Sequence, residues 1–204
     1  LEAVKNRLAR MVVVVVLIGL GFALFVKQLA IMESVAIETA FLAALYRFGA
    51  VFLLAAFIIT SQIREMNDKG LDLLLSLPIS RALFFAGKFL GYALCALLMA
   101  MIISLPLFFL APASQVMAWC MSLALELLIV TAASLFFVLA LPHSMGSLLA
   151  VLGLYVLARS MAGIQLLARG PLAEETLAQG IARGAVDGVS LLLPSLDTVT
   201  RTEW

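Results

Sequence analysis

One acidic residue lies where charged residues are rare. Glu126 is near the middle of an apolar run, 116–140, that is long enough to cross a lipid bilayer. A carboxylate at the bilayer centre costs about 2.5–3.5 kcal/mol even on the lower scales, so its side chain must face a cavity, a partner helix or a cation, or be protonated. Glu126 then lies on a substrate path or at a dimer interface, or it makes a structural hydrogen bond between helices.

The longest polar interruption between apolar segments is the stretch 64–88, REMNDKGLDLLLSLPISRALFFAGK. Its leucines Leu71, Leu74 and Leu75 recur at helical spacing, and Pro78 would end such a helix because the residue before a proline disfavours the α conformation. A short helix tied between two membrane spans can pass the movement of a docked partner to both spans. The alternative is an amphipathic loop that lies on the membrane surface without a partner.

The same stretch contains only a fragment of a nucleotide-binding loop. Gly87 and Lys88 end a P-loop pattern, but Ala82 stands at the position of the required earlier glycine and Phe89 replaces the serine or threonine. No HExxH, GxSxG or paired-carboxylate pattern occurs elsewhere. We therefore expect that the chain is not an enzyme by itself and binds no nucleotide or other cofactor of its own.

The residues that could bind a metal are few and scattered. Cys95 and Cys120 lie inside apolar runs, where a free cysteine is a small packing residue. His143 follows a proline and has no cysteine or second histidine near it in sequence, so a metal site is the minor reading. The net charge of +1 argues against a nucleic-acid partner.

Residues 64–88 resemble the first cytoplasmic loop of ABC-2 type transporter permeases. That family has an acidic residue, a polar run, Gly-Thr, a hydrophobic and an acidic residue, leucines, a proline, and later Gly-Lys. Lys69 and Gly70 stand where the family has Gly-Thr. The matching residues are Glu65, Gly70, Leu71, Asp72, Leu74, Leu75, Pro78, Arg81, Gly87 and Lys88.

The resemblance implies a permease subunit of an ABC exporter, paired with a second copy or a related permease. It also implies a separate cytosolic ATPase subunit that binds ATP and magnesium, with the loop as a coupling helix in a cleft of that ATPase. The docking residues would be Glu65, Gly70, Leu71, Asp72, Leu74, Leu75, Pro78 and Arg81. The alternatives are a membrane scaffold or assembly subunit without a transport cycle, and a permease dedicated to cytochrome c maturation.

Composition places all of these residues in a membrane protein. Hydrophobic residues make up 65% of the 204 and charged residues 12%, whereas a soluble domain has about half and a quarter. We predict an all-α integral protein of the bacterial inner membrane, a single transmembrane domain over 1–204. Five spans are expected, with a sixth in the full chain: 11–26, 46–63, 82–111, 116–140 and 145–158.

The segments between the spans are expected to alternate across the membrane. The basic amphipathic lead 1–10 places the N-terminus in the cytoplasm. An amphipathic helix over 28–46 then lies on the outer face, and the coupling loop 64–81 is cytoplasmic. Residues 159–204 form an external helical cap, or a partly re-entrant hairpin, before the sixth span. Pro106 should kink the outer end of the third span.

Overall fold

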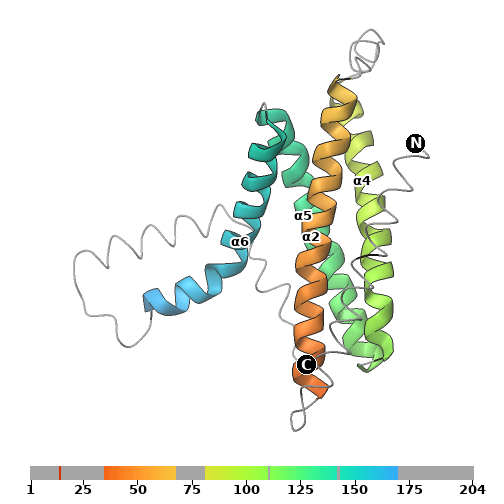
Figure 1. Cartoon of the computed structure of the whole chain (residues 1–204), viewed down its shortest axis with the longest axis vertical. Helices are drawn as coiled ribbons and strands as arrows, with labels where there is room; N and C mark the ends of the chain where they lie inside the picture. Colours follow the sequence, from red (N-terminus) through yellow and green to blue (C-terminus); the bar gives the residue numbers. More distant parts are fainter. Residues whose placement is uncertain (1–13, 15–34, 68–80, 110, 142, 170–204) are drawn as a thin grey trace. The chain divides into compact units, whose positions relative to one another are not determined.

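All secondary-structure elements in the described part of the chain are helices (Figure 1). A computed structural model describes residue 14 and residues 35–67, 81–109, 111–141 and 143–169; side chains 35–38, 81, 109 and 161–169 are outside the description. Its elements are α2 (Val35–Asn67), α4 (Arg81–Ser104), the 3-10 helix η1 (Leu105–Phe109), α5 (Ala113–Ala140) and α6 (Ser144–Arg169). The chain divides into two compact units within α6, between Val151 and Leu152, and the contacts analysed below lie in the first.

Three helical segments are long and apolar enough to cross a membrane. They cover Thr39–Asn67, Ala82–Phe108 and Ala113–Ala140, with 29, 27 and 28 residues, whereas about 20 suffice for a bilayer. These spans indicate a membrane-embedded protein and confirm the all-α prediction. The apolar part of α6, Ser144–Ser160, is shorter. The first predicted span, 11–26, lies outside the described residues except for Val14.

The predicted boundary at residue 46 is wrong. Instead of a surface helix joined to a span, α2 is one unbroken helix of 33 residues. Its sequence before residue 46 is rich in alanine and leucine, which favour helix, and it contains no proline. Leu42, Ala43 and Tyr46 are buried, so this part already belongs to the packed bundle. Residues 28–34 of the predicted surface helix lie outside the described part.

The third predicted span changes helix type near its end. The α-helix ends at Ser104 and η1 follows, with Pro106 as its second residue. Proline lacks the N–H that an α-helix needs and clashes with the preceding turn, so the expected kink takes the form of a 3-10 turn. Pro112 then precedes α5, and Val116 N–H donates to its carbonyl at 3.2 Å. The predicted outer turn, 112–115, is therefore mostly the first turn of α5.

A short turn joins α5 to α6. Leu141 is extended, with φ of −114° and ψ of 134°, and its N–H donates to the Phe137 carbonyl at 2.9 Å. The Ser147 hydroxyl lies 3.1 Å from the His143 carbonyl and 3.2 Å from the Phe137 carbonyl, which ties the two helix ends together. α6 contains no proline and continues to Arg169, so no helix end marks the predicted boundary at 159 between the fifth span and the external cap. Residues 170–204 of the predicted cap lie outside the described part of the chain.

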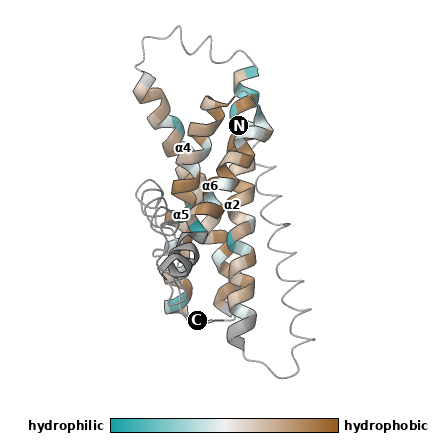
Figure 2. Cartoon of the chain, turned by 90° about the vertical axis from the view of Figure 1, so that its left-hand side faces the viewer, coloured by the Kyte–Doolittle hydropathy of each residue, from teal (hydrophilic) through white to brown (hydrophobic). Residues whose placement is uncertain are grey.

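Helix α5 packs against both α2 and α4 (Figures 1 and 2). Helices α2 and α5 run parallel, because residues further along α2 contact residues further along α5. Helices α2 and α4 run antiparallel, because Glu65 contacts Lys88 whereas the earlier Ser61 contacts the later Tyr92. Large side chains fill the interior, among them Tyr46, Leu54, Ile58, Trp119 and Leu123.

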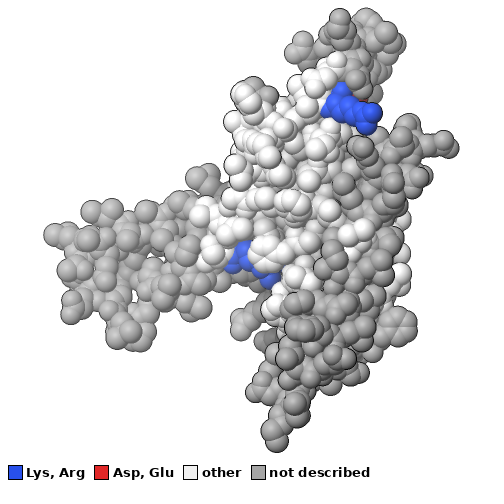
Figure 3. Space-filling model, in the orientation of Figure 1, with Lys and Arg blue, Asp and Glu red and all other residues white. Residues whose placement is uncertain are grey.

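The outward-facing side chains of the same helices are also apolar. Phe52, Leu90, Leu94, Met121 and Phe136 are each about half exposed or more. The described surface in Figure 3 is correspondingly mostly uncharged, and basic side chains show at few places. Apolar residues on both the inner and outer faces are typical of helices surrounded by lipid, where packing rather than burial from water drives association.

We predict that Leu123→Ala destabilises the bundle and that Leu125→Ala on the same helix does not. Leu123 is fully buried, whereas Leu125 is 48% exposed. Removing buried methyl groups leaves a cavity and loses packing contacts, roughly 1–3 kcal/mol here, since the transfer term is small in lipid. Thermal unfolding of both purified variants in detergent measures the difference, and equal melting temperatures would contradict this packing.

Candidate functional site

A buried ion pair joins α2 to α5. Arg47 Nη1 lies 3.0 Å from Glu126 Oε2 and 3.2 Å from Ser122 Oγ. Its guanidinium also lies 5.5 Å from the centre of the Trp119 ring, within the range of a cation–π contact. The side chains of Arg47 and Glu126 are only 3% and 0% exposed, so the two charges are paired out of contact with solvent.

Helical spacing brings the α5 members of this cluster together. Trp119, Ser122 and Glu126 are three and four residues apart, which places them on one face of the helix. Glu126 is the fourteenth of the 28 residues of α5, and Arg47 is the ninth residue of the span Thr39–Asn67. The pair therefore lies well inside both spans.

The other charged residues of the three spans lie at a different level. They are Arg64, Glu65 and Lys88, all close to the segment that joins α2 to α4. Charged residues within a membrane span are costly and mark functional sites or structural pairs. Arg47 and Glu126 are the pair to which this applies.

The expectation that Glu126 faces protein rather than lipid is confirmed, and the cation beside it is Arg47. Sequence analysis missed Arg47 because the predicted span began at residue 46, where a basic residue at the membrane edge is ordinary. The available signal was that Arg47 is the single charged residue between Glu38 and Arg64. An isolated basic residue and an isolated acidic residue in two apolar runs are candidates for pairing.

We predict that replacing either Arg47 or Glu126 alone destabilises the protein much more than replacing both. Arg47→Leu or Glu126→Leu removes one member of a buried ion pair and should cost about 3–5 kcal/mol, whereas the double Leu variant should be close to the native protein or more stable. Thermal unfolding of the two single variants and the double variant gives the coupling energy. If the effects of the single changes simply add in the double variant, the two side chains do not interact.

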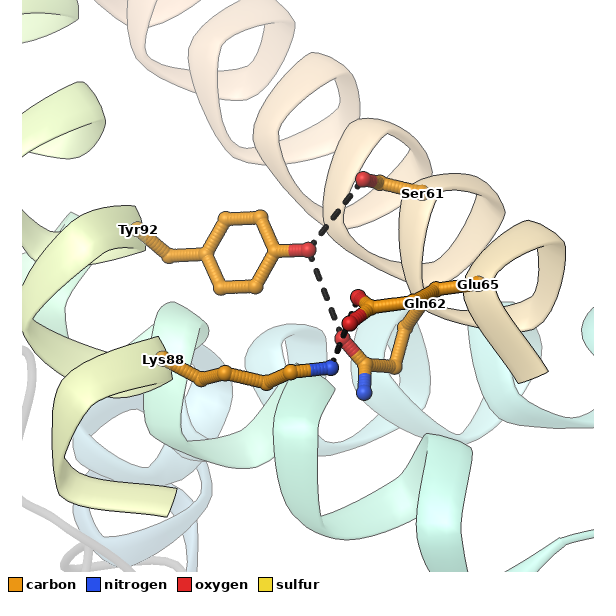
Figure 4. A network of polar contacts seen from close by, with 5 residues as sticks. All are labelled: Ser61, Gln62, Glu65, Lys88 and Tyr92. Atoms are coloured by element: carbon orange, nitrogen blue, oxygen red, sulfur yellow. Dashed lines mark hydrogen bonds and ion pairs between the residues drawn. The ribbon is translucent and has the colours of Figure 1, made fainter. Parts of the chain in front are cut away.

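A second polar cluster lies where α2 ends and α4 begins (Figure 4). Lys88 Nζ lies 2.7 Å from Glu65 Oε2, with side chains 12% and 35% exposed. One turn further along α4, the Tyr92 hydroxyl lies 3.2 Å from Ser61 Oγ and 3.4 Å from Gln62 Oε1. Its single O–H can donate to one of these oxygens at a time.

We call this cluster the loop clamp; it joins the end of α2 to the beginning of α4 through Ser61, Gln62, Glu65, Lys88 and Tyr92. Lys88 Nζ also lies 4.8 Å from the centre of the Phe84 ring, which adds a cation–π contact. The clamp therefore holds the end of α2 against the beginning of α4 through side chains of both helices. Glu65 thus has a bonding partner within the chain itself.

The structure does not describe the side chains of the other residues that were predicted to dock an ATPase. Arg81 is the first residue of α4, and its side chain is outside the description. The remaining docking residues lie outside the described part of the chain: Gly70, Leu71, Asp72, Leu74, Leu75 and Pro78. Among the described residues, no three histidine, cysteine, aspartate or glutamate side chains come together as a metal site would require.

Comparisons with known proteins give no relative for this chain: no protein-family model, curated protein or solved structure matches it.

Proposed function

We propose that the chain is the transmembrane permease subunit of an ABC exporter, driven by a separate cytosolic ATPase. The chain itself is then not an enzyme, and ATP and magnesium bind to the partner. The observation that carries the proposal is the loop clamp: Glu65 and Lys88, both part of the ABC-2-like stretch 64–88, are joined at 2.7 Å. A docking loop of this kind has to be fixed to the spans that it moves.

The clamp supports a mechanical role for the loop. A flexible loop absorbs a push from a bound partner, whereas a loop with its ends joined passes the push to the helices. Here the two helices that flank the loop are joined twice, by the ion pair and by the Tyr92 contacts one turn deeper. Movement of the loop would therefore displace the ends of α2 and α4 together.

The buried ion pair extends this connection to α5. Arg47 and Gln62 are on the same unbroken helix, 15 residues and about 22 Å apart at 1.5 Å per residue. A displacement of α2 at the clamp would thus act on its contact with Glu126 in the middle of α5. We propose that α2 carries the movement from the ATPase to the interior of the spans.

The remaining parts of the proposal follow from the same assignment. The membrane is the bacterial inner membrane, and the N-terminus is in the cytoplasm. The loop 64–81 is also cytoplasmic and lies beside the ATPase. A second copy of the chain or a related permease completes the transport path. Copurification of the tagged full chain from mild detergent should bring down an ATPase that carries its own nucleotide-binding loop.

We predict that Leu74→Asp with Leu75→Asp separates the permease from its ATPase. Burying a leucine is worth roughly 1.5–3 kcal/mol, so losing two docked leucines weakens binding by a few powers of ten, and the new charges add a desolvation cost. The measurement is recovery of the ATPase with the tagged variant, together with ATP-driven transport. The matched control is Ser76→Asp with Ser80→Asp, which adds the same charge to the loop and should keep the partner.

Three outcomes would count against the assignment. Normal partner binding and transport by the leucine variant would show that these leucines form no docking helix. Failure of the variant to insert into the membrane would place the segment within the bilayer rather than in water. A copurified partner without any ATPase activity would instead favour the scaffold or assembly subunit.

A further inference from the structure

A pocket of about 280 Å³ lies between the last turns of α2 and α5. Ile63, Met66 and Asn67 of α2 line one side of it, and residues 138–141 at the end of α5 line the other. Met66 and Leu139 are 42% and 47% exposed, so the pocket opens to the outside of the bundle. Sites for small molecules have volumes of roughly 300–1,000 Å³, so this pocket suits one small group rather than a large ligand.

The electrostatics of the pocket favour a positive charge. Helices α2 and α5 run parallel, so the carboxyl ends of both, each with a partial negative charge, adjoin the pocket. None of the lining residues is charged, and the last turn of α5 contains no basic residue. Arg64, in the last turn of α2, is exposed and does not line the pocket.

Oxygen atoms that can accept hydrogen bonds lie at the end of each helix. Pro142 has no N–H, so the carbonyl of Val138 lacks the donor that an α-helix would otherwise supply from four residues later. Asn67 is the only lining residue with a polar side chain, and its amide oxygen is a second acceptor. A donor that enters the pocket thus meets acceptors from both helices.

A third oxygen lies one turn deeper on α5. Ser134 is four residues before Val138 and seven before Leu141, so it is on the face of α5 that lines the pocket. Its side chain is fully buried, and its hydroxyl has no hydrogen-bond partner among the described residues. Buried polar groups are normally paired, so this hydroxyl is free to bond a donor that reaches the floor of the pocket.

We propose that this pocket binds an ammonium group carried on a short apolar stem. The three N–H donors of an ammonium group match the oxygens, and the stem packs against Ile63, Met66 and Leu139. A carboxylate is repelled by the carbonyls and the two helix ends, and an alcohol brings one donor and no charge. The inference goes beyond the proposed function and does not depend on an ATPase.

The test is a titration of the purified full chain in detergent, labelled with ¹³C at the methionine methyl groups. The Met66 signal, assigned with Met66→Leu, reports on the pocket, and Met121, which is 62% exposed elsewhere on α5, reports on changes in the detergent. We expect n-butylammonium to shift the Met66 signal saturably and to leave Met121 unchanged. Butyrate and 1-butanol, the matched anion and alcohol, should bind at least about tenfold more weakly.

Ala140→Lys places a tethered ammonium group at the exposed edge of the pocket and should abolish the Met66 response. The matched control is Ala113→Lys, which adds the same charge at the exposed opposite end of α5 and should keep native binding. If Ala140→Lys does not fold, Ser134→Ala takes its place. This variant removes one acceptor for a charged donor and should weaken binding about tenfold.

An ammonium group on an apolar stem occurs both in small amphipathic amines and in lysine side chains of a bound protein. Nα-acetyl-lysine methylamide, titrated in the same way, distinguishes them: tighter binding than n-butylammonium indicates a lysine side chain, and weaker binding indicates a free amine. The proposal is overturned if n-butylammonium leaves Met66 unshifted, if it shifts Met66 and Met121 alike, if butyrate or butanol binds as tightly, or if the folded pocket variant keeps native affinity.

Discussion

A charge in hydrocarbon needs a partner, and this constraint governs how the three spans are arranged. Glu126 is at the midpoint of α5 and is fully covered, so its carboxylate is costly there unless a cation or polar group lies beside it. Arg47 meets that need from α2 at 3.0 Å, which fixes both the rotation of α2 and its register against α5. Apolar packing alone specifies register weakly in lipid, because lipid chains are as apolar as the side chains they replace.

Helix α2 connects this buried pair to the loop clamp. It is unbroken over 33 residues, and it carries polar contacts at two levels described above: Arg47 with α5, and Ser61 to Glu65 with α4. In the proposed permease, the same helix would receive movement at the cytoplasmic loop and pass it to the interior.

The sequence predicted the helical class and the approximate positions of the three spans, because runs of more than 20 apolar residues allow little else in a membrane. It predicted the environment of Glu126 for the same energetic reason. It did not predict that α2 continues through residue 46, because glutamates at 33 and 38 made that region resemble a surface helix. With the boundary at residue 46, Arg47 was assigned to the membrane edge. Its partner Glu126 is 79 residues away in the sequence, and a contact at that separation has no local sequence signature.

The central claim is that Arg47 and Glu126 meet inside the membrane, and a solid-state NMR distance measurement tests it directly. The full chain, reconstituted in lipid with ¹⁵N-labelled arginine and ¹³C-labelled glutamate, is compared with the Glu126→Gln variant. We predict strong dipolar coupling between the Arg47 guanidinium and the Glu126 carboxyl carbon, consistent with the 3.0 Å contact between nitrogen and oxygen, and its loss in the variant. Identical coupling in the two samples would contradict the account.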